Sequence, residues 1–424
     1  MKENSIFDVQ NSKLKPAAFL WDESFLWGIM AYKALTAGGL AFDLVRSEDI
    51  RNGRLKNYAM LFVPGGWASN KLKALGDDGV REIKSFVHGG GAYLGFCGGA
   101  GLATLDGIGL VPVRRKPTRE RVPSFSGPIR LDTSGHPLWE GIAGPVFHAW
   151  WPSQFIVGDG SVAVLAAYGE AMPGSFSSDV NVGDAALGCN WAELERIYQI
   201  NLDPGRMLRD PAVLEGTFGK GKVVLSLVHF DTPGDRNGAA VLANLWQYLA
   251  PNAECAVRSA ECGARNDQTA ESAIVLQLEK SVTELIALGQ RNFLWYWRNS
   301  ALLQWRRGVR GLEYCTLYIM VKELSGLLGK QDRGPAIPEL EAGLVRIREL
   351  LLPFADRAKQ LLLRERYAMQ HGHITYEKCD DPAIQAIREE LFSRSKSHGG
   401  AFKRLIDEID GFLFRVLTGD AHGT

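Results

Sequence analysis

The residues with the clearest chemical potential are a cysteine, a histidine and an aspartate. Cys97 lies in the run Gly-Phe-Cys-Gly-Gly-Ala-Gly, between an apolar segment and a segment with helical spacing. Small neighbours permit the strained strand-to-helix turn that exposes a nucleophile at the end of a parallel sheet. A helix N-terminus also favours a thiolate, because its free N–H groups stabilise negative charge. We therefore expect Cys97 to be a nucleophile.

A cysteine nucleophile needs a base, because a free thiol with a pKa of about 8.5 is only slightly ionised at neutral pH. His229 follows the apolar segment 223–228, and Asp231 stands two residues further on. We expect the imidazole to emerge at the same sheet edge as Cys97 and Asp231 to orient it, as in a triad of nucleophile, base and acid. The expected oxyanion hole consists of the backbone N–H group of Gly98 and that of Gly66 or Trp67.

These residues need a sheet that brings several loops to one edge, and residues 1–250 predict such a sheet. Short apolar runs alternate with helical patterns, which is typical of βαβ units with a parallel sheet. The loop at 64–67 and the Cys97 turn both follow strands, and ligands bind at the carboxyl ends of parallel strands. We expect strands over 16–21, 41–45, 58–63, 92–96 and 223–228, and helices over 25–37, 80–88 and 238–249.

The loop at 64–66, the Cys97 turn and the run His-Phe-Asp at 229–231 together resemble the class I glutamine amidotransferase-like superfamily. Residues 15–250 are most similar to the domain found at the N-terminus of eukaryotic biotin-protein ligases and in free-standing bacterial proteins. The resemblance implies an α/β, flavodoxin-like parallel-sheet domain. It also implies that Cys97 forms a thioester with an acyl substrate.

Two positions depart from the glutaminases of this superfamily. Gly101 stands where they usually have Gln four residues after the nucleophile, and their His-Pro-Glu is His-Phe-Asp here. We identify neither a synthetase domain nor the biotin ligase catalytic domain. The resemblance therefore implies a cysteine-dependent hydrolase or amidotransferase-like enzyme for an amide or acyl bond. The two departures disfavour glutamine as the substrate. We expect a different small-molecule or peptide-like acyl compound.

Each candidate residue also has a purely structural interpretation. Cys97 is compatible with packing in a small-residue turn, and His229 with a structural position at a strand end. Asp231 is compatible with a turn or a helix cap, and the glycines with tight turns alone. The alternative function is a non-catalytic sensor or scaffold, which binds a small molecule in the amidotransferase-like pocket.

Three further residues are candidates for substrate contacts. Glu23 follows the first expected strand, which places it at the edge that carries Cys97, although an N-cap role for its neighbours Asp22 or Ser24 is the competing interpretation. His148 and Trp151 belong to the run His-Ala-Trp-Trp-Pro, whose rings combine apolar area with polar groups. Core packing is the alternative for both.

Residues 271–424 have helical spacing and almost no strand signal, which predicts an all-α helical bundle domain. The small, polar segment 251–270 is expected to be a linker. Within 291–314, four residues recur every four positions and are expected to form one helical stripe: Phe293, Trp297, Ala301 and Trp305. Core packing, contact with a protein partner or a second copy, and an aromatic-basic face for nucleic acid or a membrane surface are the alternatives for this segment. The expected helices cover 271–328, 339–369, 382–394 and 401–417.

Composition limits other functions. The 424 residues carry 48 basic and 48 acidic side chains, so no overall field attracts nucleic acid. Six cysteines without a CxxC pair disfavour a disulfide framework and zinc, and we expect no metal and no cofactor. We recognise neither a signal peptide nor a membrane span, which predicts a cytoplasmic protein.

Overall fold

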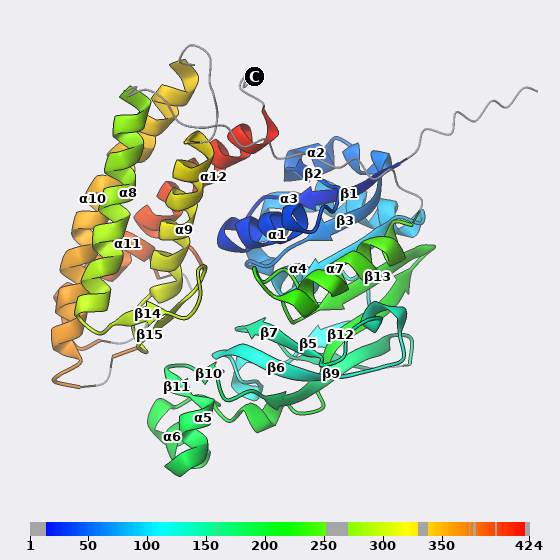
Figure 1. Ribbon diagram of the computed structural model, residues 1–424, viewed down its shortest axis with the longest axis horizontal. Coiled ribbons are helices and arrows are strands. Elements are labelled where there is room, and N and C mark those ends of the chain that lie inside the picture. The colour runs from blue at the N-terminus through cyan, green and yellow to red at the C-terminus, as the bar shows by residue number, and fades with distance from the viewer. Residues whose placement is uncertain are drawn as a thin grey trace, which may run out of the picture.

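The computed structural model describes residues 14–158, 160–251, 270–329, 338–372, 374–375, 379–394 and 397–419. Figure 1 shows an α/β part built on a large sheet, and a group of long helices beside it. The expected linker falls almost entirely on residues 252–269, which lie outside the described residues.

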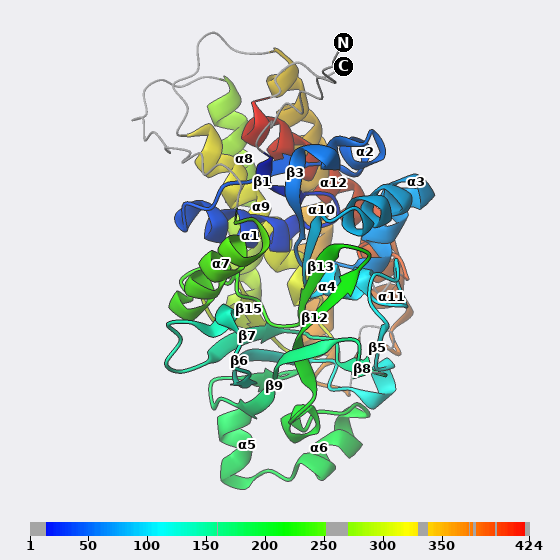
Figure 2. The same cartoon turned by 90° about the vertical axis from the view of Figure 1, so that its right-hand side faces the viewer.

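Five neighbouring strands form the parallel half of the sheet, as the alternating pattern predicted. Their residues are buried because helices cover both faces, with α1 and α7 on one side and α3 and α4 on the other (Figures 1 and 2). The strand order is β13 (Gly221–Ser226), β4 (Ala92–Phe96), β3 (Tyr58–Val63), β1 (Lys15–Leu20) and β2 (Asp43–Val45). The helices are α1 (Phe25–Ala37), α2 (Ser47–Arg51), α3 (Ala68–His88), α4 (Gly98–Ala103) and α7 (Arg236–Leu249).

Beyond β13 the same sheet continues with antiparallel strands, in the region where the sequence is least regular. Two short helices, α5 (Val182–Gly188) and α6 (Trp191–Tyr198), extend from its edge. The added strands are β12 (Pro211–Phe218), β9 (Ala163–Ala171), β6 (Phe125–Thr133), β7 (Val146–Trp150), β10 (Phe176–Ser177) and β11 (Val180–Asn181). A separate small sheet pairs β5 (Val113–Arg115) with β8 (Phe155–Val157).

The C-terminal part is helical, as predicted. Its helices pack through a continuous apolar core that includes Leu344, Leu351 and Phe412. No helix among the described residues is long and apolar enough to cross a membrane. The five helices are α8 (Ala270–Arg291), α9 (Gly311–Leu328), α10 (Pro338–Ala368), α11 (Pro382–Phe392) and α12 (Gly400–Thr418).

The helical stripe expected within 291–314 is wrong. β14 (Trp295–Trp297) and β15 (Leu303–Trp305) form an antiparallel hairpin between α8 and α9. The Asn299 side chain accepts hydrogen bonds from two backbone N–H groups in the turn, at 2.8 Å each, which competes with helix formation. Aromatic residues also favour strands. The four-residue spacing of these rings therefore does not place them on one face of a helix.

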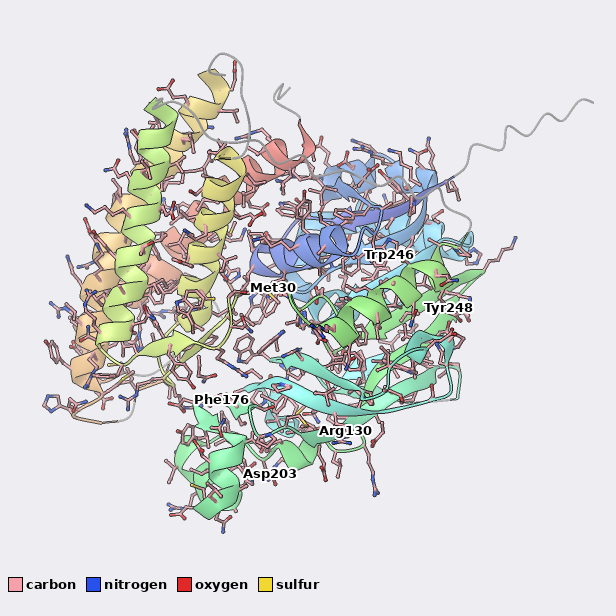
Figure 3. The ribbon with its side chains drawn as sticks, in the orientation of Figure 1. Met30, Arg130, Phe176, Asp203, Trp246 and Tyr248 are labelled. Carbon is pink, nitrogen blue, oxygen red and sulfur yellow. The ribbon has the colours of Figure 1, made fainter. Side chains whose placement is uncertain are left out.

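The hairpin docks on the antiparallel end of the large sheet. The Arg298 guanidinium donates to Ser126 Oγ at 2.8 Å and to Ser126 O at 3.1 Å. It also lies 4.8 Å from the ring centroid of Phe176, which Figure 3 labels at the sheet edge nearest the helices. At the other end of the contact, Arg46 pairs with Asp410 of α12 at 3.2 Å. The helical part therefore packs along one side of the α/β part.

Candidate active site

Cys97 occupies the sharp turn between β4 and α4. Its backbone has φ 48° and ψ −104°, a conformation that is costly for a residue with a Cβ. The turn is held because the Cys97 N–H donates to Ser226 O at 2.7 Å and the Gly101 N–H donates to Cys97 O at 2.9 Å. The side chain is partly exposed at the N-terminus of α4.

The loop after β3 lies directly against this turn, backbone to backbone. A Cβ on Gly98 would lie 1.7 Å from Gly66 O, and a Cβ on Gly99 would lie 2.0 Å from Val63 O. Neither position has room for a side chain. The glycines therefore allow the two loops to meet at the carboxyl edge of β3 and β4.

His229 and Asp231 follow β13, the strand beside β4. His229 Nδ1 lies 2.9 Å from Asp231 Oδ1, and both side chains are fully buried. Burial lowers the pKa of His229, but the Asp231 carboxylate and the interaction with Cys97 outweigh it and raise the pKa to about 10. His229 Nε2 has no regular hydrogen-bond partner among the described residues. The imidazole thus lies in the interior with Asp231 at Nδ1, while Nε2 is on the other side of the ring.

Neighbouring groups fix the position of the His229 ring. The Trp27 ring centroid lies 4.8 Å from that of the imidazole, and a Cβ on Gly65 would lie 3.0 Å from His229 Cε1. The backbone N–H of His229 donates to the backbone carbonyl oxygen of His148 at 2.7 Å. These contacts leave the ring little freedom to turn.

The three backbone groups expected to form an oxyanion hole belong to the two loops that meet. Gly66 has φ 117°, which leaves its peptide close to that of Gly98. In the described part of the chain, the N–H groups of Gly66, Trp67 and Gly98 donate to no acceptor. Unpaired donors next to a thiol are the arrangement that an oxyanion would use.

Glu23, His148 and Trp151 have partners within the protein. Glu23 Oε1 pairs with Lys403 of α12 at 2.9 Å, and Glu23 Oε2 accepts from Asn70 Nδ2 at 3.2 Å. His148 Nδ1 lies 3.0 Å from an oxygen of Asp235, and its ring stacks on Trp150. Glu23 and His148 are therefore held in place by other side chains of the protein.

Trp151 connects the site to the helical part. Its ring stacks on Trp305 of β15 and meets Trp27 edge-on, with centroids 6.2 Å apart. Trp151 has φ 49°, so its backbone is also in the left-handed region. The Trp151 ring contacts Trp27, and Trp27 in turn packs against the His229 imidazole.

Lys71 is a residue near the site that the sequence analysis missed. Its side chain is fully buried, and Nζ donates to Ser24 Oγ at 2.5 Å and to Asp22 O at 3.1 Å. Burial lowers its pKa to about 7, although nearby acidic groups and Cys97 act against that shift. Its spacing could have indicated that Lys71 is buried, because it lies on the buried face of α3 with Leu75 and Ile83.

No cluster of His, Cys, Asp and Glu suited to a metal ion occurs within the described ranges. The fixed groups around Cys97 are instead an imidazole, backbone N–H groups and basic side chains. They favour nucleophilic attack and stabilisation of negative charge.

Comparison with known proteins agrees with the predicted resemblance over one segment. Residues 44–106, which contain β3, the following loop and Cys97, match the family model described as the N-terminal part of biotin-protein ligase. His229 and Asp231 lie outside that segment. No curated protein matches the chain.

Solved structures with similarity to the chain include glutamine amidotransferases. PurLQS from Thermotoga maritima has 16% identity over 56% of this chain and 99% of that chain, with a TM-score of 0.40. A glutamine amidotransferase has 20% identity over 56% and 99%, with a TM-score of 0.36. A β-galactosidase from Bacillus circulans has 13% identity over 57% of this chain and 32% of that chain, with a TM-score of 0.35.

Proposed function

We propose that this chain is a cysteine-dependent enzyme that acts on an amide or other acyl bond through a thioester at Cys97. His229 would carry the proton and Asp231 would orient it. The observation that carries the proposal is the strained turn that holds Cys97 at the end of β4, beside the end of β13, where the buried His229–Asp231 pair follows. A cysteine that served only in packing would gain nothing from a costly backbone conformation.

The raised pKa of His229 sets the starting state of the proposed reaction. An imidazole with a pKa of about 10 is protonated at neutral pH, and a cation of this kind stabilises negative charge on a nearby sulfur. Thiolate, not thiol, is the nucleophile. We therefore propose an ion pair of thiolate and imidazolium in the resting enzyme, with Asp231 as the buried counter-charge.

The proposed first step forms the thioester. The Cys97 sulfur attacks the acyl carbon, and the carbonyl electron pair moves to the oxygen, where the N–H groups of Gly66 and Gly98 would stabilise the charge. When the carbonyl re-forms, the bond to the leaving amine or alkoxide breaks. The leaving group takes the proton from His229, which becomes neutral.

The second step returns the enzyme to its resting state. Neutral His229 takes a proton from water as the water oxygen attacks the thioester, and the Cys97 sulfur leaves as a thiolate. An acceptor amine in place of water would make the reaction an acyl transfer. A reactive thiol of this kind suits a reducing compartment such as the cytoplasm.

A specific observation favours the alternative of a non-catalytic sensor. The helical part contacts candidate residues of the site through the stack of Trp305 on Trp151 and the ion pair of Lys403 with Glu23. A ligand that displaced either contact would change the packing of the helices. In that account the helical part would also contact a protein partner or a second copy.

Acyl transfer from p-nitrophenyl acetate to Cys97 distinguishes the two functions. We expect the native protein to carry an acetyl group on the Cys97 peptide, detected by mass spectrometry, and the His229→Ala variant to carry much less. Acetylation confined to surface residues in both proteins would contradict the enzyme proposal. A positive result would justify a screen of amide and ester substrates.

A further inference from the structure

Three side chains around Cys97 keep buried donor atoms without an acceptor. Among the described residues, no hydrogen-bond partner is found for Arg115 Nε, Arg121 Nε or Tyr168 Oη. A buried donor without an acceptor destabilises the folded protein, and such atoms therefore point to a missing partner. The two arginine nitrogens are donors only and the tyrosine hydroxyl can donate, so a group that accepts hydrogen bonds suits all three.

Arg115 lies against the first turn of the helix that begins after Cys97. Its Nη1 lies 3.1 Å from the position that a Cβ would take on Gly101, and the Gly101 N–H is bonded to Cys97 O. Glycine at 101 therefore makes room for the guanidinium. Arg115 Nε lies 3.9 Å from the carboxylate of Asp106, an ion pair without a hydrogen bond at that nitrogen.

Arg121 interacts electrostatically with both Arg115 and Cys97. Its Nη1 donates to Ser153 Oγ at 3.0 Å, which fixes the side chain. Burial and the charge of Arg115 lower the pKa of Arg121, while the negative charge of Cys97 raises it. Asp106 offsets part of the charge of Arg115, and a second negative group between the two guanidinium groups would offset their repulsion further.

Tyr168 adds a neutral donor to the two cations. The residue is in β9, and its side chain is fully buried. Burial, followed by the charges of Cys97 and Asp210, raises the pKa of Tyr168 well above its ordinary value. The hydroxyl therefore keeps its proton at neutral pH and can donate it to an acceptor.

We propose that Arg115, Arg121 and Tyr168 form a subsite for a carboxylate group of the acyl substrate. This inference rests on the proposed function, because it assigns a substrate class to the Cys97 site. A planar carboxylate matches the donor geometry of guanidinium groups, and a hydroxyl supplies a further hydrogen bond. The substrate is then an acyl compound with a negative charge close to the bond that Cys97 attacks.

Two alkylating reagents of nearly equal size test the subsite. Iodoacetate carries a carboxylate where iodoacetamide carries a neutral amide, and both modify cysteine sulfur. The ratio of their rates at Cys97, measured by peptide mass spectrometry, is divided by the ratio for the same peptide in the urea-unfolded protein. We expect this normalised ratio to favour iodoacetate by about tenfold or more in the native protein.

Substitutions assign that preference to the subsite. Arg121→Gln and Arg115→Gln should bring the normalised ratio close to one, and Tyr168→Phe, which removes a single oxygen, should reduce it in part. Arg119→Gln is the matched control, because the Arg119 side chain is exposed and pairs with Glu120 instead of Asp106, so its loss should leave the ratio unchanged. A native ratio close to one, or a high ratio that survives Arg121→Gln and Tyr168→Phe, would overturn the subsite.

The design separates failure of the subsite from failure of the proposed function. Rapid iodoacetamide alkylation that depends on His229, without a preference for iodoacetate, would remove the subsite alone. Slow reaction of Cys97 with both reagents would remove the enzyme proposal, and thermal unfolding with glutarate then decides the subsite. A rise in Tm that is absent in Arg121→Gln would support an anion site, and no rise in the native protein would overturn it.

Discussion

The indole of Trp151 stacks on the indole of Trp305, with ring centroids 5.0 Å apart and planes inclined by 26°. Trp151 directly follows β7 of the large sheet, whereas Trp305 ends β15 in the hairpin of the helical part. Trp151 also contacts Trp27, which packs against His229. A continuous row of rings therefore joins the helical part to the proposed base.

Loss of this stack should affect both stability and the site. We expect Trp305→Ala to lower the free energy of unfolding by about 1–3 kcal/mol, from lost ring contact and burial. It should also change the rate at which iodoacetamide alkylates Cys97, because Trp151 loses its support. Phe293→Ala is the control, since that ring is 76% exposed and lies just before β14. An unchanged Cys97 rate in Trp305→Ala would refute the proposed link.

Lys71 should make stability depend on pH in a defined direction. Its pKa is about 7 in the folded protein and about 10.5 ordinarily, so between these values the folded state binds fewer protons than the unfolded state. The contribution of Lys71 to the free energy of unfolding therefore rises between pH 7 and pH 10.5 and is lost on acidification. Lys71→Met should remove that dependence, and its gain in stability over the native protein should be larger at pH 6.5 than at pH 9.

Urea unfolding of both proteins at the two pH values measures this difference. The comparison isolates Lys71, because the raised pKa of His229 contributes stability in the opposite direction and is present in both proteins. The expected difference is on the order of a few kcal/mol. A gain for Lys71→Met that is equal at pH 6.5 and pH 9 would show that Lys71 does not titrate in this window.

Gly98 should tolerate no side chain. A Cβ there would overlap the carbonyl oxygen of Gly66 at 1.7 Å, so Gly98→Ala must separate the two loops. We expect a loss of at least about 1–3 kcal/mol in unfolding free energy and a slower alkylation of Cys97. Gly144→Ala is the matched control, because no heavy atom lies within 4 Å of its added Cβ. Equal stability of the two variants would show that the loops do not meet as described.

Local features of the fold could be predicted from the sequence. β3, β4 and α1 begin and end at the expected residues, because apolar runs and helical spacing are properties of adjacent positions. The turn at Cys97 is also local, since glycines on its C-terminal side both permit the backbone and allow the approach of the next loop. The match over residues 44–106 lies within this region.

Features that depend on distant contacts could not be predicted in this way. A period of four between aromatic residues suggested a helix at 291–314, but Asn299 turns the chain and the rings pack in a hairpin. The sequence suggested that the Glu23 carboxylate contacts a substrate. In the structure it pairs with Lys403, which is distant in the sequence. Arg115 gives no sequence signal, because only the folded chain places it against Gly101.

The most direct test of the account is the rate at which iodoacetamide alkylates Cys97 at pH 6.5, in the native protein and in His229→Ala. The exposed Cys189 is an internal reference in the same digest. We predict that native Cys97 reacts at least about tenfold faster than Cys189 and that His229→Ala abolishes the difference. If Cys97 reacts no faster than Cys189, or keeps its rate without His229, the proposed nucleophile is contradicted.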